Sequence, residues 1–192
     1  MVIIILLAVL TGSVILLCVR NPEVHFSRKD AFQEEAFDLT LSAGIRGGTI
    51  YYTLNGDTPT TESDVYTMPI RVEAGLPMAT TVVKAMVVQG GIESSVYTQT
   101  YFVGRGVSEL FDTMVVSLTT DQANLYDEKT GIFTNWDQVN DENGSWERQA
   151  YIEFYEHDGT PKIAQGTGIA VSGHGSRGYD QKSIKLIASK QY

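Results

Sequence analysis

The sequence has few of the residues that hold disulfide-rich domains or metal sites together. It contains one cysteine, Cys18, and three histidines in 192 residues. A single cysteine excludes an intrachain disulfide. The histidines are too far apart in sequence to show metal-ligand spacing, and they are His25, His157 and His174. We therefore expect no bound metal, and we assign the histidines to the surface or to loops.

Positive charge is also scarce. The chain carries 14 Lys and Arg residues against 23 Asp and Glu residues, which gives a formal net charge of -9 at pH 7. An acidic surface repels phosphate backbones and anionic lipid head groups. The composition therefore disfavours nucleic acid as a partner and suits an extracellular or cell-surface domain.

Charged residues are absent from the N-terminal run of residues 2–19. As a helix, about 18 residues would extend about 27 Å, which is enough to cross a bilayer core. No basic residue precedes the run, and Leu16 and Leu17 stand where a signal-peptide cleavage site needs small residues. The pattern predicts an uncleaved transmembrane helix that anchors the chain to a membrane through residues 2–19.

Residues 22–104 have the composition of an all-β module. Four stretches rich in Val, Ile, Thr, Tyr and Phe are separated by Gly, Asn, Asp and Pro, and they are residues 36–42, 49–54, 80–89 and 96–103. Asn55-Gly56 stands where a tight turn needs a positive φ, and Pro59 interrupts strand pairing soon afterwards. The pattern predicts a small β-sandwich of the Ig or fibronectin type.

One segment of this module carries a signature. Its residues 51–60 read Tyr-Tyr-Thr-Leu-Asn-Gly-Asp-Thr-Pro-Thr, which resembles a motif of the C-terminal β-sandwich of chitobiases and hexosaminidases. The resemblance implies an accessory domain without glycosidase carboxylates, used as a spacer or as a contact for surface polysaccharide. Tyr51, Tyr66 and Tyr97 are candidates to stack on sugars, or they pack at the edges of a small core.

The last two dozen residues place a glycine cluster between two alternating apolar segments. Gly173, Gly175 and Gly178 have the spacing of a phosphate-binding loop, in which residues without a Cβ let backbone N–H groups approach an anion. A dinucleotide-binding fingerprint needs a helix after the glycines, whereas residues 182–188 alternate like a strand. The pattern predicts strand, loop and strand, either as the nucleotide flap of a kinase or as a hairpin with positive-φ glycines.

A longer series of motifs extends from Met114 to Leu186. The series consists of five segments, which are residues 114–127, 130–133, 145–159, 168–173 and 176–186. The first segment contains a capping-box pattern at Thr119 and Gln122, which predicts one short helix. The order of the five segments resembles the opening segment of the spore coat protein H (CotH) kinase family, a group of atypical, secreted or surface-associated protein kinases. The resemblance implies that residues 113–192 are the first strands of an incomplete α+β kinase-like domain.

The same resemblance implies a role for the glycine loop. The expected contacts with nucleotide phosphates are Lys182, Gly173, Gly175 and Arg177, with Lys185 as the substitute for Lys182. Ordinary surface lysines are the alternative. The family's catalytic and metal-binding carboxylates are expected beyond residue 192, so we assign no catalytic and no metal-binding residue. ATP and Mg²⁺ are expected only for a complete family member, and we predict no kinase activity for this chain by itself.

These patterns divide the chain into an anchor at residues 1–21, a β-sandwich at residues 22–104 and a truncated kinase-like segment at residues 113–192. The first functional hypothesis is a membrane-anchored N-terminal fragment of a CotH-like kinase, whose full-length form would act on a protein acceptor. The alternative is a stand-alone cell-surface protein that binds carbohydrate or serves in adhesion. The basic residues that follow residues 2–19, Arg20, Arg28 and Lys29, favour a cytoplasmic globular part. The types of the two predicted modules favour the outside of the cell, and we expect an extracytoplasmic location.

Overall fold

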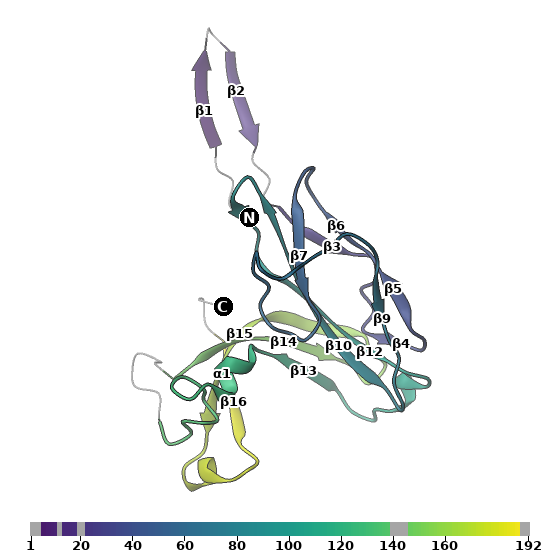
Figure 1. Ribbon diagram of the computed structural model, residues 1–192. Helices are drawn as coiled ribbons and strands as arrows, with labels where there is room; N and C mark the ends of the chain where they lie inside the picture. The colour runs from purple at the N-terminus through teal and green to yellow at the C-terminus, as the bar shows by residue number, and fades with distance from the viewer. Residues whose placement is uncertain (1–4, 11–12, 19–21, 139–145, 189–192) are drawn as a thin grey trace.

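The computed structural model describes residues 5–10, 13–18, 22–138 and 146–188, and in these ranges the chain is mainly β (Figure 1). Its largest sheet has six strands, in the order β4, β12, β10, β7, β8, with β11 paired to the end of β10. The bounds are β4 (Phe32–Gln33), β7 (Thr49–Thr53), β8 (Asp64–Val65), β10 (Ala79–Gln89), β11 (Ile92–Glu93) and β12 (Tyr97–Val103). We call it the central sheet.

Two small sheets cover one face of the central sheet. They pair β3 (Val24–Phe26) with β6 (Leu41–Ala43), and β5 (Phe37–Leu39) with β9 (Ile70–Val72). The core between these layers is apolar and includes Leu39, Val72, Val83, Val87 and Tyr101. The four predicted strand regions and the β-sandwich are therefore confirmed, with residues 36–42 divided between β5 and β6.

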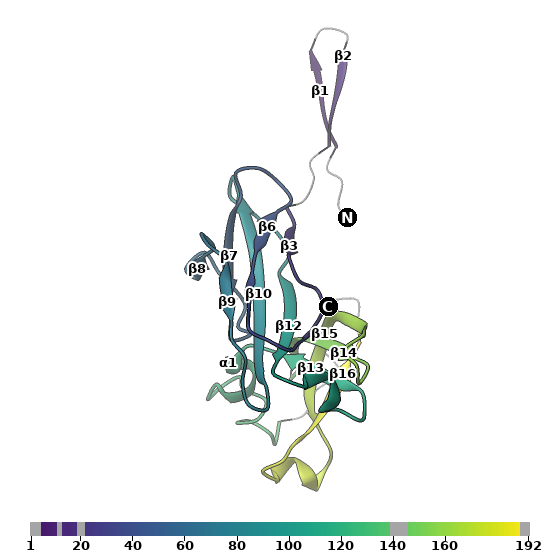
Figure 2. The same ribbon diagram turned by 90° about the vertical axis from the view of Figure 1, so that its right-hand side faces the viewer.

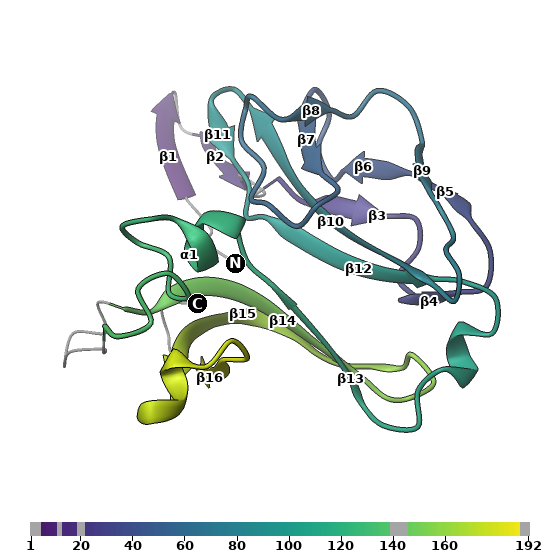
Figure 3. The same cartoon turned by 60° about the horizontal axis from the view of Figure 1, so that its bottom comes forward.

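The opposite face of the central sheet is covered by a four-stranded antiparallel sheet, which we call the second sheet (Figures 2 and 3). Its strands are β13 (Val115–Thr119), β14 (Arg148–Tyr155), β15 (Pro161–Ser172) and β16 (Ser183–Ile187), in that order. Three short helices accompany it: η1 (Val107–Glu109), α1 (Gln122–Tyr126) and η2 (Gly175–Gly178). Strand, glycine loop and strand at the C-terminal end are confirmed, because β15 and β16 pair through Ile169 with Leu186.

The two faces of the central sheet carry different kinds of side chain, and both faces are covered. Val83 and Tyr101 face the small sheets, whereas Lys84, Thr100 and Phe102 face the second sheet. The first set is apolar and the second is largely polar. Sequence alternation of this kind usually marks a face exposed to water, but here Lys84 and Thr100 are 6% and 0% exposed because the second sheet lies over them.

The prediction of an N-terminal transmembrane helix is wrong. Residues 5–10 and 13–18 form an antiparallel strand pair, β1 (Ile5–Leu10) and β2 (Ser13–Cys18), that stands apart from the other sheets (Figure 1). The rest of the predicted anchor lies outside the described residues. The run is rich in Val and Ile, whose branched Cβ atoms favour extended backbone, so its length alone was a poor guide. Within the described ranges, no helix is long and apolar enough to cross a membrane.

The predicted fold class is therefore corrected to a mainly β chain with several sheets. The described part of residues 113–192 contains the antiparallel second sheet and a single five-residue α-helix, α1. No part of it that the structure describes has the longer helices that an α+β domain would add.

The turn at Gly56 supports a prediction about the contact between the layers. Gly56 has φ +85°, and a Cβ there would lie 2.8 Å from the Cγ2 atom of Thr119 on β13. Gly90 also has a positive φ, +57°, but a Cβ there would meet nothing within 4 Å. We expect Gly56→Ala to lower the free energy of unfolding by about 2 to 3 kcal/mol, because backbone strain adds to overpacking against a buried Thr.

The control for this prediction is Gly90→Ala, which shares the backbone strain and lacks the contact. We expect it to cost about 1 kcal/mol. Urea titration of the purified chain measures both values. Equal losses in the two variants would show that the Gly56 turn is not packed against the second sheet.

Candidate functional site

An open cleft with a volume of about 630 Å³ lies between the central sheet and the second sheet. The central sheet and its β7–β8 loop contribute one wall, and α1, β14 and β15 contribute the other. The polar side chains that line it include Lys84, Thr98, Asp121, Asn124, Gln149 and Tyr151. The cleft is therefore built from segments that are far apart in sequence.

An aromatic cluster closes the opposite end of this interface. Phe32 and Phe102 of the central sheet lie with ring centroids 5.5 Å apart, and Phe102 is 6.1 Å from Tyr155 of β14. Phe111 packs 5.5 Å from Phe32. Tyr155 is 2% exposed, so this end of the interface is a shared core of the two sheets.

A buried carboxylate lies between the aromatic cluster and the cleft. Glu153 on β14 is 2% exposed. Its Oε1 atom accepts hydrogen bonds from the Tyr155 hydroxyl at 2.7 Å and from the Thr100 N–H at 3.3 Å, and its Oε2 atom accepts one from the Thr100 hydroxyl. Ser117 contacts the same Thr100 hydroxyl at 2.8 Å. These hydrogen bonds supply the partners that a buried carboxylate needs.

The same network changes the acidity of the tyrosines. Burial raises the pKa of Tyr155, and the negative charge of Glu153 raises it further. Burial and Glu153 also raise the pKa of Tyr101. Both phenols stay protonated at neutral pH, so Tyr155 can donate to Glu153.

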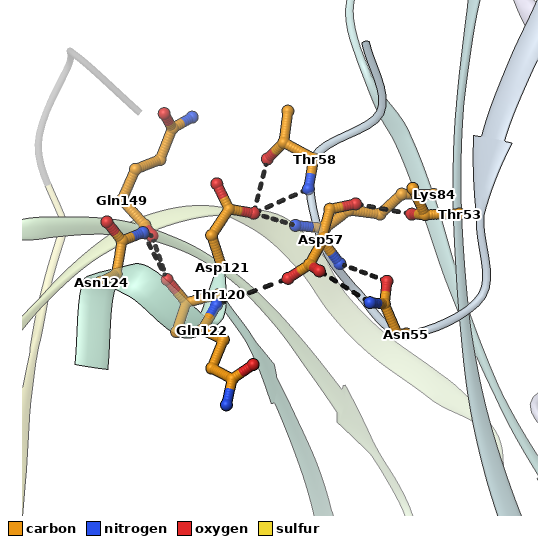
Figure 4. Close-up of polar contacts among 10 residues, drawn as sticks. All are labelled: Thr53, Asn55, Asp57, Thr58, Lys84, Thr120, Asp121, Gln122, Asn124 and Gln149. Atoms are coloured by element: carbon orange, nitrogen blue, oxygen red, sulfur yellow. Dashed lines mark hydrogen bonds and ion pairs between the residues drawn. The ribbon is translucent and has the colours of Figure 1, made fainter. Parts of the chain in front are cut away.

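Asp121 joins the two sheets at the edge of the cleft (Figure 4). Its Oδ1 atom accepts hydrogen bonds from the N–H of Thr58 at 2.7 Å and from the Thr58 hydroxyl at 2.8 Å. The same oxygen lies 3.9 Å from the Nζ atom of Lys84. Asp57 makes a reciprocal contact, because its Oδ1 atom accepts from the N–H of Gln122 at 3.4 Å. A turn of the sandwich is thereby fixed to the start of α1.

This arrangement corrects the predicted helix cap. The short helix is present as α1, but its N-cap residue is Asp121 and not Thr119, and Asp121 makes no side-chain capping bond. Its carboxylate is directed to Thr58 instead. A tertiary contact has therefore replaced the local one that the capping-box pattern predicts.

Lys84 is the buried cation of the site. Its side chain is 7% exposed, and it lines the cleft from β10. Burial lowers the pKa of Lys84, and the charges of Asp121 and Asp57 raise it in part. The two carboxylates therefore offset some of the cost of placing an ammonium group between two sheets.

Two amide side chains complete the cleft. The Nδ2 atom of Asn124 donates to the Thr120 hydroxyl at 2.8 Å and to the carbonyl of Gln149 at 3.2 Å. These bonds fix the orientation of the Asn124 amide. The Gln149 side chain is exposed, and within the described part of the chain it makes no hydrogen bond (Figure 4). The cleft thus offers one fixed and one free amide to a ligand.

The predicted phosphate-binding residues lie elsewhere. Gly173 follows β15 with φ +107°, Gly175 and Arg177 belong to η2, and Lys182 directly precedes β16. The Nζ atom of Lys182 donates to the carbonyls of Arg177 at 3.1 Å and of Tyr179 at 2.9 Å. The structure therefore brings Lys182 and Arg177 together within their own loop, away from the cleft lining. A nucleotide contact by these residues stays a prediction.

The predicted sugar-stacking tyrosines are each half-buried. Tyr66 and Tyr97 pack against the core between the central sheet and the small sheets. Tyr66 also contacts Tyr52, with the ring centroids 6.5 Å apart. Tyr66 and Tyr97 therefore pack at the edge of the core, which was the alternative to sugar stacking. Tyr151, which lines the cleft, was not among the candidates.

A comparison with protein families bears on this architecture. Residues 31–100 match the model of the chitobiase/beta-hexosaminidase C-terminal domain. The match begins beside β4 and ends within β12, so it covers most of the β-sandwich. A search of curated proteins found no match to the chain. The resemblance of the sandwich is therefore confirmed, and no comparison supports the resemblance of residues 113–192 to the CotH kinases.

Proposed function

We propose that this protein binds carbohydrate in the cleft between the central sheet and the second sheet. The observation that carries the proposal is the cleft itself, an open site lined by a carboxylate, two amides and a Tyr ring. Sugar hydroxyls both donate and accept hydrogen bonds, which suits carboxylate and amide partners. A Tyr ring offers an apolar face for sugar C–H groups together with a polar hydroxyl.

The matched family supports the same class of ligand. It is named after chitobiases and hexosaminidases, which are enzymes of carbohydrate metabolism, and a domain attached to such enzymes suits a binding or spacer role. The sandwich then acts as the scaffold, and the second sheet completes the site. A cell-surface location fits this role and remains a prediction.

The test uses the whole chain and a panel of insoluble polysaccharides: chitin, cellulose, β-1,3-glucan and mannan. We expect at least one of them to retain the protein. Gln149→Ala should weaken that binding about tenfold, because it removes a free amide that can form one or two hydrogen bonds with the ligand. Its free energy of unfolding should change by less than about 0.5 kcal/mol, since the side chain makes no bond within the described residues.

Gln165→Ala is the matched control. Gln165 is an exposed residue of β15 on the opposite face from Gly166, which lines the cleft. We expect this variant to bind like the unaltered protein. The proposal fails if no polysaccharide retains the chain, or if the two variants bind alike.

A further inference from the structure

Lys84 presents unused hydrogen-bond donors to the cleft. Its side chain is more than nine-tenths buried, with 7% exposure, yet it lines the cleft from β10. An ammonium group has three N–H donors. The separation of 3.9 Å between its Nζ atom and Asp121 is too long for a hydrogen bond. In the part of the chain that the structure describes, Nζ makes no hydrogen bond, so its donors are available to a ligand.

Asp121 presents an acceptor beside these donors. Its Oδ1 atom is occupied by the two bonds from Thr58 and by the ion pair with Lys84. Its Oδ2 atom makes no hydrogen bond within the described ranges, and the side chain is 40% exposed on the cleft. Because Thr58 holds the carboxylate in place, little further ordering is needed when a ligand binds.

The charges around this pair select against an anionic ligand. Lys84 is flanked by two carboxylates, Asp121 and Asp57, which leaves a local excess of negative charge. The whole chain has a formal net charge of -9. A carboxylated or sulfated sugar would be repelled by the local excess of negative charge and by the net negative charge of the whole chain. A neutral sugar meets a donor and an acceptor side by side without that penalty.

We propose that Lys84 and Asp121 together recognise two adjacent hydroxyl groups of a neutral sugar, and that the cleft rejects anionic glycans. One hydroxyl accepts a hydrogen bond from the Lys84 ammonium, and its neighbour donates one to Asp121 Oδ2. This proposal rests on the proposed carbohydrate-binding function and specifies its ligand class.

The first test compares oligosaccharides prepared from whichever polysaccharide retains the protein with the same oligosaccharides oxidised at C6. Oxidation replaces a primary hydroxyl with a carboxylate. By calorimetric titration of the whole chain, we expect the oxidised form to bind about tenfold more weakly at 50 mM NaCl. We expect that gap to narrow at 500 mM NaCl, because salt screens the repulsion. The affinity for the neutral form should change by less than about twofold between these two salt concentrations.

The second test removes each member of the pair. Lys84→Met keeps much of the apolar stem and removes the donors, and we expect about tenfold weaker binding of the neutral oligosaccharide. Asp121→Asn keeps an acceptor for Thr58, replaces the Oδ2 acceptor with a donor, and should weaken binding about fivefold. Thermal unfolding of both variants confirms that they remain folded.

The outcomes separate this proposal from the one on which it rests. If no polysaccharide retains the chain, the carbohydrate-binding function is wrong. If neutral sugar binds but both variants bind it unchanged, the Lys84 and Asp121 proposal is wrong and the function stands. Equal or tighter binding of the oxidised form, or a gap that salt does not narrow, also contradicts it.

Discussion

Tyr155→Ala is expected to lower the free energy of unfolding by about 4 kcal/mol, the usual cost of removing a buried aromatic ring from a core. Tyr155 is 2% exposed, packs 6.1 Å from Phe102 of the central sheet, and donates to Glu153 at 2.7 Å. Its loss opens a cavity between the sheets and leaves Glu153 with fewer partners. Urea unfolding followed by Trp fluorescence measures the change.

Tyr155→Phe is the matched control, because it keeps the ring and removes the hydroxyl. We expect it to cost about 1 to 3 kcal/mol, because a buried oxygen of Glu153 loses a hydrogen-bond donor. A single cooperative transition is expected in all three proteins, since the two sheets share a core. Two separate transitions, with Tyr155→Ala affecting one of them alone, would show that the sheets fold independently.

Asp121→Ala is expected to lower the free energy of unfolding by about 2 to 3 kcal/mol. It removes the acceptor for the Thr58 N–H and hydroxyl, bonded at 2.7 and 2.8 Å, and it takes a counter-charge from the buried Lys84. The estimate stays below the usual cost of breaking a fully buried pair because Asp121 is 40% exposed. Urea unfolding again provides the measurement.

Lys84→Met separates the two contributions to the stability loss in Asp121→Ala, which are the hydrogen bonds from Thr58 and the counter-charge for Lys84. Burial lowers the pKa of Lys84 despite its acidic neighbours, so removing the ammonium group should leave stability unchanged or slightly raised. In the Asp121→Ala background, Lys84→Met should recover about 1 kcal/mol, because no unpaired buried charge remains. An equal loss from Asp121→Ala with and without Lys84 would mean that the ion pair contributes nothing.

The sandwich could be predicted from sequence because its signals are local. Alternating Val, Ile, Thr and Tyr side chains mark β7, β10 and β12, and Asn55-Gly56 marks the turn after β7. The N-terminal run of residues 2–19 gave a wrong prediction because it carries two local signals that disagree. Its apolar length is a membrane signal, whereas its β-branched composition matches the β1 and β2 strands that the structure contains.

The cleft could not be predicted, because its residues meet through tertiary structure alone. Lys84 lies on β10 and Asp121 is the N-cap residue of α1, and nothing local to either residue indicates the other. Lys84 alternates with core residues of β10, which is the pattern of a solvent-facing position. The glycine loop at residues 173–178 was predicted as the binding site instead, because its glycine spacing matches that of phosphate-binding loops. A hint was available in Lys84 itself, since a lysine at the centre of a long apolar strand is unusual.

The central claim, that the cleft between the two sheets binds carbohydrate, is tested most directly by nuclear magnetic resonance of the ¹⁵N-labelled whole chain titrated with a soluble oligosaccharide. We predict that the largest shifts fall on the side-chain amides of Asn124 and Gln149 and on the backbone amides of Asp121 and Tyr151, which line the cleft. Shifts confined to Tyr66 and its neighbours on the sandwich, or no shifts at saturating oligosaccharide, would contradict the account.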